Sequence, residues 1–331
     1  MSRQRIVWLA LLRGLNILLV VMFHVQLIDM TTGENHAFCK VICEPFTPFR
    51  MPLFIFCSGG LLYLSRIRKQ WDVKPLYIDK VKRIVVPFVF FVTFYYLFKL
   101  LLNPFTKTPI VFSLGNFLES FCVYYGHPSA HLWFLSVLFW MMLLYPLFRW
   151  LCESKVWMIV FLLFTVGIYF FDIDVPADKN YFFLFSLHKY MVFFFAGIFF
   201  FRFELYTYFK SILSLVLTAG GYIVSLMYEV PLLTSIMGIL CMISLSYQLA
   251  RLYPTLFCSF REYIYQIFLM SFIFQPFVEL VLWKSLFYNE QLFLVFYVLN
   301  VLSGIYLPVL ISKIVERSHY QWLKMCLGLK V

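Results

Sequence analysis

Residues 8–29 read Trp8-LALLRGLNILLVVMFHVQLI-Asp29, and this stretch decides the fold class. It is a nearly unbroken apolar run of about the 20 residues that an α-helix needs to cross a lipid bilayer. Arg13 and His24 are the ionisable side chains between its ends. Eleven residues make about three helical turns, so we expect both side chains on one helix face, about 16 Å apart. Ionisable groups at membrane depth are costly and usually line an internal cavity, so this pair is the leading candidate for a functional site.

Similar apolar runs recur along the whole chain of 331 residues, which is 63% hydrophobic and 13% charged. A soluble domain of this size has too little interior for so much apolar surface, so composition indicates a polytopic integral membrane protein. We predict an all-α transmembrane bundle that forms a single domain over residues 1–331. The ten expected spans are residues 6–29, 46–65, 84–103, 132–150, 156–172, 182–201, 211–229, 231–250, 262–283 and 291–312.

The basic residues predict the orientation of these spans. With the N-terminus in the cytoplasm, 19 of the 27 Lys and Arg fall in inner loops and five in outer loops. Positive charge concentrates on the cytoplasmic side of membrane proteins, so we predict that both termini are cytoplasmic. The net charge of +11 therefore records orientation and contact with membrane lipids. The sequence has no soluble basic domain that would bind nucleic acid, so nucleic acid is not an expected partner.

The cysteines and histidines do not predict a metal site. The eight cysteines are scattered, and only Cys39 and Cys43 lie close enough in sequence to form a disulfide in an oxidising loop. His127 and His131 have the i, i+4 spacing of helical metal ligands, but Pro128 between them opposes a helix. We therefore expect no bound metal.

His24 and Arg13 each allow a functional and a structural interpretation. An imidazole can take a proton from a hydroxyl near neutral pH, whereas a purely structural histidine would form hydrogen bonds between helices. Arg13 on the same face favours the functional interpretation of His24. The Arg13 guanidinium points toward the cytoplasm, where it either snorkels to the interface or holds a phosphate that enters from the cytosol.

Arg50 and Ser58 belong to the start of the second expected span. Arg50 enters from the outer side, near the depth of His24 if the first two spans are antiparallel neighbours. Ser58 and the following pair Gly59-Gly60 allow close approach of a backbone or a ligand, and close helix packing is the favoured explanation for the glycines.

The inner loop 66–83 carries seven basic residues against two Asp. It either fixes the orientation and binds anionic lipid, or binds a polyphosphate-bearing cofactor through Lys82 and Arg83, which lie nearest the membrane. At the outer interface, His131 and Trp133 combine polar and aromatic character. They could stack on a sugar ring or belong to an ordinary aromatic belt.

Four motifs, taken in order, resemble those of the membrane acyltransferase-3 family. The ten expected spans also resemble that family, so the resemblance covers most of the chain. One position departs from the pattern, because Ser271 stands where the family often has a histidine after a Tyr-rich segment. The motifs are LLRGLNILLVVMFH at 11–24, RMPLFIFCSGG at 50–60, KVKRIVVPF at 80–88 and HLWFL at 131–135.

The resemblance implies transfer of an acyl group, commonly acetyl from acetyl-CoA, to a hydroxyl of an extracytoplasmic glycan or lipid-linked sugar. It implies a location in the bacterial inner membrane, and it does not specify an oligomeric state. An alternative is a transporter or flippase for a glycolipid or anionic substrate, which predicts inverted repeats and broken helices that the sequence does not show. In the enzyme interpretation His24 is the general base. The CoA phosphates are bound by Arg13, Lys82 and Arg83. The substrate contacts are Arg50, Ser58, His131 and Trp133.

Overall fold

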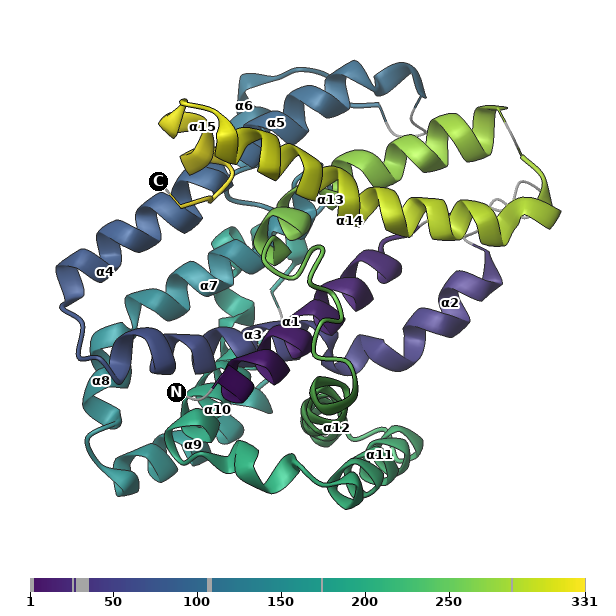
Figure 1. The fold of residues 1–331 in the computed structure, drawn as a ribbon. Helices are drawn as coiled ribbons and strands as arrows, with labels where there is room; N and C mark the ends of the chain where they lie inside the picture. The colour runs from purple at the N-terminus through teal and green to yellow at the C-terminus, as the bar shows by residue number, and fades with distance from the viewer. Residues whose placement is uncertain are drawn as a thin grey trace. The chain divides into compact units, whose positions relative to one another are not determined.

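A computed structural model describes residues 3–25, 27, 36–105, 109–173, 175–286 and 288–330. All regular secondary structure in these residues is helical (Figure 1). The predicted all-α class is therefore confirmed. The long apolar runs explain this, because a helix satisfies its own backbone hydrogen bonds inside a membrane.

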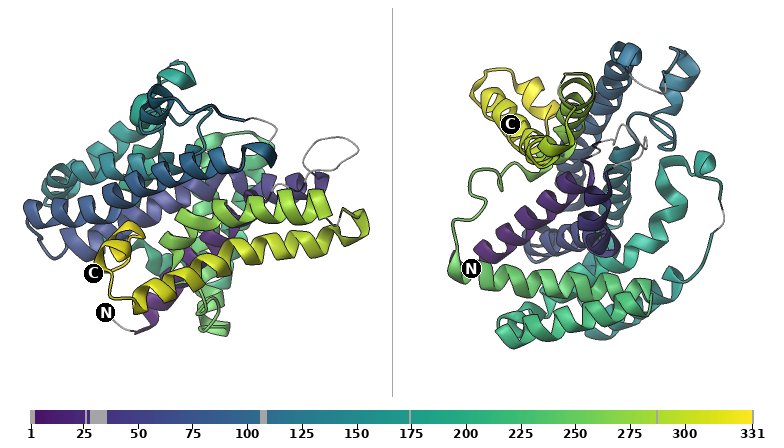
Figure 2. Two further views of the ribbon diagram at one scale, coloured as in Figure 1. Left: turned by 90° about the horizontal axis from the view of Figure 1, so that it is seen from above. Right: turned by 90° about the vertical axis from the view of Figure 1, so that its right-hand side faces the viewer.

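The chain divides into two compact units, of which the first comprises Met1–Phe54 and Glu204–Ile314. In this unit α1 packs against α12 and α13, and α11 lies alongside α12 (Figures 1 and 2). Its helices are α1 (Arg3–Phe23), α2 (Ala37–Cys43), the first half of α3 (Thr47–Leu62), α11 (Ile212–Met227), α12 (Pro231–Leu252), α13 (Ile264–Phe277), the π-helix η9 (Val278–Leu286) and most of α14 (Phe293–Arg317), with the short 3-10 helices η1 (Glu44–Phe46), η8 (Leu205–Phe209) and η10 (Glu290–Leu292).

The second unit comprises Ile55–Phe203 and Val315–Val331. In this unit α9 packs against α10, α4 against α7, and α15 against α5. Its helices are the end of α3, the π-helices η2 (Tyr63–Ile67) and η3 (Val81–Val85), α4 (Val73–Lys80), α5 (Val86–Leu101), α6 (Leu114–Glu119), α7 (Trp133–Leu143), α8 (Tyr145–Leu151), α9 (Lys155–Tyr169), α10 (Leu187–Arg202) and α15 (Gln321–Cys326), with the 3-10 helices η4 (Asn103–Phe105), η5 (Ala130–Leu132), η6 (Ala177–Lys179) and η7 (Tyr181–Ser186).

Several of these helices are long and apolar enough to cross a membrane, which makes the chain a multi-pass membrane protein. Among the described residues there are five such segments, or six if Ala130–Leu143 and Tyr145–Leu151, which are bent by 53°, form one span. The predicted count of ten spans and the cytoplasmic termini stay predictions. The five segments are Val73–Leu101, Tyr181–Arg202, Pro231–Leu252, Ile264–Lys284 and Glu290–Arg317.

Three shorter apolar helices, Val7–Phe23, Lys155–Tyr169 and Ile212–Met227, coincide with further expected spans. The expected break between residues 229 and 231 is present, since α11 and α12 are separated by a short turn. Pro231 begins α12, a first helical position where its missing N–H costs no hydrogen bond.

The glycine pair of α3 packs closely against α10, as the sequence favoured. A Cβ atom on Gly59 would overlap the carbonyl of Phe194, and one on Gly60 would overlap the ring of Phe201. Gly197 of α10 approaches the carbonyl of Phe56 in the same way. Only residues without a side chain allow the two backbones to come this close.

Candidate functional site

His24 follows directly after α1, which ends at Phe23. The expected helix over residues 6–29 was therefore too long at this end. The backbone N–H of His24 donates to the carbonyls of Val20, at 3.3 Å, and Val21, at 3.2 Å. His24 thus sits in the last, loosened turn of the helix, where a hydrogen bond is shared between two carbonyls and tertiary contacts decide the geometry.

Aromatic rings and a guanidinium surround this helix end. The His24 ring lies 4.2 Å from the ring of Phe272 in α13 and 5.2 Å from that of Phe23, measured between centroids. The Arg50 Cζ atom lies 3.3 Å above the centroid of the Phe23 ring, a distance at which a cation is attracted to the aromatic face. Arg50 is also buried, with 7% of its surface exposed. The structure therefore brings a fixed positive charge and an imidazole against one phenylalanine ring.

Two buried amides that the sequence reasoning missed hold the end of α1 in place. The Gln275 Nε2 atom donates to the Val21 carbonyl at 2.9 Å, and the Asn300 Nδ2 atom donates to the Gln275 carbonyl at 3.2 Å. The Val21 carbonyl thus accepts from both Gln275 and His24. Gly304 of α14 makes room for this arrangement, since a Cβ atom there would lie 3.0 Å from side-chain carbons of Val21 and Gln275.

A signal for Gln275 and Asn300 was present in the sequence, because each is an amide within an otherwise apolar stretch of helix. Polar side chains inside membrane helices usually face the bundle interior and bind one another or the backbone. In sequence, Gln275 lies more than 200 residues from its partner Val21, and Asn300 lies 25 residues from its partner Gln275. The sequence therefore shows that these amides need a partner, and the structure identifies it.

Ser271, which replaces the expected family histidine, lies next to Phe272 in α13. It is 1% exposed, and its hydroxyl has no hydrogen-bond partner among the described residues. The position where the family often has a second histidine is therefore adjacent to the ring that packs on His24. A buried hydroxyl without a partner is unfavourable, so this position is suited to a polar ligand or an ordered water.

Arg13 lies in α1 and is partly buried. Asn16, three residues further along, lies about 60° from Arg13 around the helix axis. Asn16 is 1% exposed, and neither polar atom of its amide has a hydrogen-bond partner among the residues that the structure describes. The middle of α1 thus combines a guanidinium with an unsatisfied amide, a pairing suited to a polar or anionic ligand.

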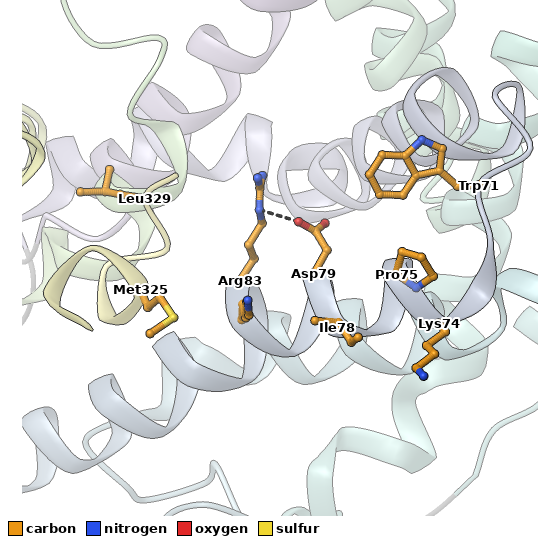
Figure 3. A pocket seen from close by; sticks show the side chains of 9 residues that line it. Trp71, Lys74, Pro75, Ile78, Asp79, Arg83, Met325 and Leu329 are labelled. Atoms are coloured by element: carbon orange, nitrogen blue, oxygen red, sulfur yellow. Dashed lines mark ion pairs between the residues drawn. The ribbon is translucent and has the colours of Figure 1, made fainter. Parts of the chain in front are cut away.

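Lys82 and Arg83 lie on η3 and line a cavity of about 620 Å³ in the second unit (Figure 3). The Asp79 carboxylate binds Arg83 at 2.9 Å and Arg66 at 3.1 Å, and the Arg66 guanidinium stacks 3.3 Å above the Trp71 ring. The full lining is Trp71, Lys74, Pro75, Ile78, Asp79, Lys82, Arg83, Met325 and Leu329.

Ser58, His131 and Trp133 also lie in the second unit. The His131 ring is buried and meets the Tyr95 ring edge-on at 4.5 Å. Trp133 stacks on Phe183, with 4.8 Å between centroids. Both rings thus contact aromatic side chains of the protein. Their role as substrate contacts stays a prediction.

The candidate residues thus form two centres, one in each unit. The first contains His24 and Arg50, which share the Phe23 ring, and the second contains the cavity with Lys82 and Arg83, whereas Arg13 lies eleven residues before His24 in α1. A water-filled path that joins Arg13 to His24 stays a prediction.

Cys39 and Cys43 are both free thiols. Burial raises the pKa of Cys39 to about 11 and also raises the pKa of Cys43. In the described part of the chain, no three His, Cys, Asp or Glu side chains are grouped so that they could hold a metal ion.

The fold and its apolar spans define a multi-pass helical membrane protein, with the candidate site among its buried polar residues. A family model described as an acyltransferase domain, of the acyltransferase-3 type, matches residues 6–313 of the 331. The chain belongs to this family, which confirms the resemblance seen in the motifs and indicates an acyltransferase. No curated protein and no solved structure matches the chain.

Proposed function

We propose that this protein is an O-acyltransferase of the bacterial inner membrane. It moves an acetyl group from acetyl-CoA, bound from the cytoplasmic side, to a hydroxyl of a cell-surface glycan or lipid-linked sugar. The observation that carries this proposal is the His24 centre within an acyltransferase domain: an imidazole at the end of α1, enclosed by Phe23 and Phe272, with the Arg50 guanidinium on the same Phe23 ring.

In the proposed reaction, His24 accepts the proton of the acceptor hydroxyl while the hydroxyl oxygen attacks the thioester carbonyl. The carbonyl becomes a tetrahedral oxyanion, and Arg50 stabilises its negative charge. When the intermediate collapses, the carbon–sulfur bond breaks and the CoA sulfur takes the proton from the His24 imidazolium. The products are the acetylated sugar and CoA with a free thiol, and His24 returns to its neutral form.

Arg13, Lys82 and Arg83 bind the phosphates of the donor in this proposal. The support is chemical, because all three are cations that the orientation rule assigns to the inner half of the membrane or the inner loops. Lys82 and Arg83 also line a cavity large enough for part of a nucleotide. Ser58, His131 and Trp133 are proposed contacts of the acceptor.

Membrane vesicles given radiolabelled acetyl-CoA test the proposal. We expect label in glycan or lipid-linked sugar with the wild-type chain, and at least a 100-fold lower rate with His24→Ala, because general-base catalysis typically contributes 10²- to 10⁴-fold. His319→Ala is the matched control, since His319 is exposed near the C-terminus. Movement of substrate across the vesicle membrane without covalent label would support a transporter instead.

A further inference from the structure

The cavity of the second unit is completed by a part of the chain that the acyltransferase domain does not include. The family match ends at residue 313, whereas Met325 and Leu329 of the cavity belong to α15 and the residues just after it. The remaining lining residues come from the segment 71–83. The C-terminal helix therefore adds one wall to a site whose other walls belong to the family domain.

The two ends of this cavity differ in chemistry. Figure 3 shows Met325 and Leu329 at one end, Trp71, Lys74 and Pro75 at the other, and Asp79 and Arg83 between them. The C-terminal wall is wholly apolar. The wall from the segment 71–83 carries three cations and one carboxylate. A ligand that matches both walls has an anionic part and an apolar body.

Most of the positive charge is available to such a ligand. The Asp79 carboxylate forms ion pairs with Arg83, at 2.9 Å, and with Arg66, at 3.1 Å. Lys74 and Lys82 are exposed, and neither forms an ion pair with a residue that the structure describes. Two ammonium groups with flexible stems are suited to bind phosphate as point charges.

The backbone at this site is also unusual. Lys82 and Arg83 lie on η3, a π-helix of five residues inserted between α4 and α5. Such wide turns are rare in helices and occur frequently at functional sites. Here the wide turn places both cations at the cavity and returns the chain to a regular apolar helix within a few residues.

We propose that α15 completes a binding site for a phosphate-bearing ligand with an apolar body. Lys74 and Lys82 bind the phosphate, and Met325 and Leu329 select the body. Two ligands share this chemistry, the nucleotide end of CoA and the headgroup region of an anionic phospholipid. The assignment of CoA as the ligand rests on the proposed function, whereas the assignment of a phospholipid does not.

Binding by the purified full-length protein in detergent tests the inference, with CoA and phosphatidylglycerol as the two probes. Isothermal titration calorimetry measures the affinity for CoA, and native mass spectrometry measures how much phosphatidylglycerol stays bound. The variants are Lys74→Glu, Lys82→Gln and Met325→Glu. Lys155→Glu is the control for charge, because Lys155 is an exposed cation of the same unit outside the cavity. The elution profile from size exclusion confirms that each variant is folded.

We expect Lys82→Gln to weaken binding about five-fold and each substitution to glutamate to weaken it at least ten-fold, because Lys74→Glu replaces a phosphate-binding cation with an anion and Met325→Glu places a charge against the apolar body. Weakened CoA binding identifies a nucleotide site, and a selective loss of phosphatidylglycerol identifies a lipid site. Unchanged binding of both probes in all three folded variants would overturn the inference. Such a result would leave the His24 proposal intact, because the His24→Ala transfer assay does not depend on α15.

Discussion

The hydrogen bond from Gln275 to the Val21 carbonyl gives the sharpest prediction, because it connects α13 to the turn that carries His24. In the variant Gln275→Leu, a side chain of similar size loses this bond. The Val21 carbonyl keeps the N–H of His24, at 3.2 Å, so it is not left without a donor. The perturbation is therefore the loss of one buried hydrogen bond without an added unpaired group.

The expected magnitude follows from the strength of such a bond. A buried hydrogen bond contributes about 1 kcal/mol, and those between membrane helices average about 0.6 kcal/mol. We therefore expect the free energy of unfolding to fall by about 0.6 to 1.4 kcal/mol. If the bond holds His24 in its active position, the same energy lowers the population of that position by about three- to ten-fold. The catalytic rate constant kcat should fall by that factor, while KM for acetyl-CoA stays within two-fold.

The assay is steady-state acetyl transfer by the purified variant, together with its thermal unfolding. Gln248→Leu is the matched control, because Gln248 also donates through Nε2 to a backbone carbonyl, that of Lys210 at 3.0 Å. We expect the control to retain wild-type kcat. If Gln275→Leu keeps full activity while its stability falls, Gln275 has a purely structural role. If it loses as much activity as His24→Ala, Gln275 touches the substrate and the positioning argument is wrong.

Three further predictions concern Arg50, Gly59 and Cys39. Arg50→Lys should lower kcat at least five-fold in the transfer assay, because an ammonium cannot stack flat on the Phe23 ring as the guanidinium does; wild-type kcat in this variant would contradict a role for Arg50 in the site. Gly59→Val should reduce the yield of folded protein on size exclusion, since the contact with α10 leaves no room for a side chain; a normal yield would show that the helices can separate at no cost. Cys39 should be alkylated far more slowly than the exposed Cys258 at pH 8, because a thiol with a pKa of about 11 is almost entirely protonated there. The rate at Cys39, followed by mass spectrometry, should rise about ten-fold per pH unit toward pH 11, and a rate independent of pH would contradict the raised pKa.

Periodicity and composition predict those features of the chain that depend on local sequence. The apolar runs predicted the helical membrane class, and the four motifs predicted the family. The glycine pair at 59–60 predicted close helix packing because a missing Cβ has one main structural use in a membrane helix. The break before Pro231 was equally local, since proline fixes the first turn of the helix that follows.

The contacts that organise the two centres depend on residues far apart in sequence, and no local pattern encodes them. Gln275 reaches Val21 across the fold, and α15 and the residues just after it supply Met325 and Leu329 to a cavity of the segment 71–83. The length of α1 was misjudged for a related reason. Apolarity continues to residue 28, so the sequence alone favours a longer helix, whereas the structure ends it at Phe23, where Gln275 binds a carbonyl of the last turn.

A single-turnover measurement with purified protein tests the role of His24 most directly. Acetyl-CoA is bound first, acceptor is then added, and the rate of acetyl transfer is compared between the wild-type chain and His24→Ala. We predict that the two proteins bind acetyl-CoA with equal affinity and that transfer is at least 100-fold slower in the variant. Transfer at the wild-type rate in a folded His24→Ala protein that binds acetyl-CoA would show that the imidazole is not the base.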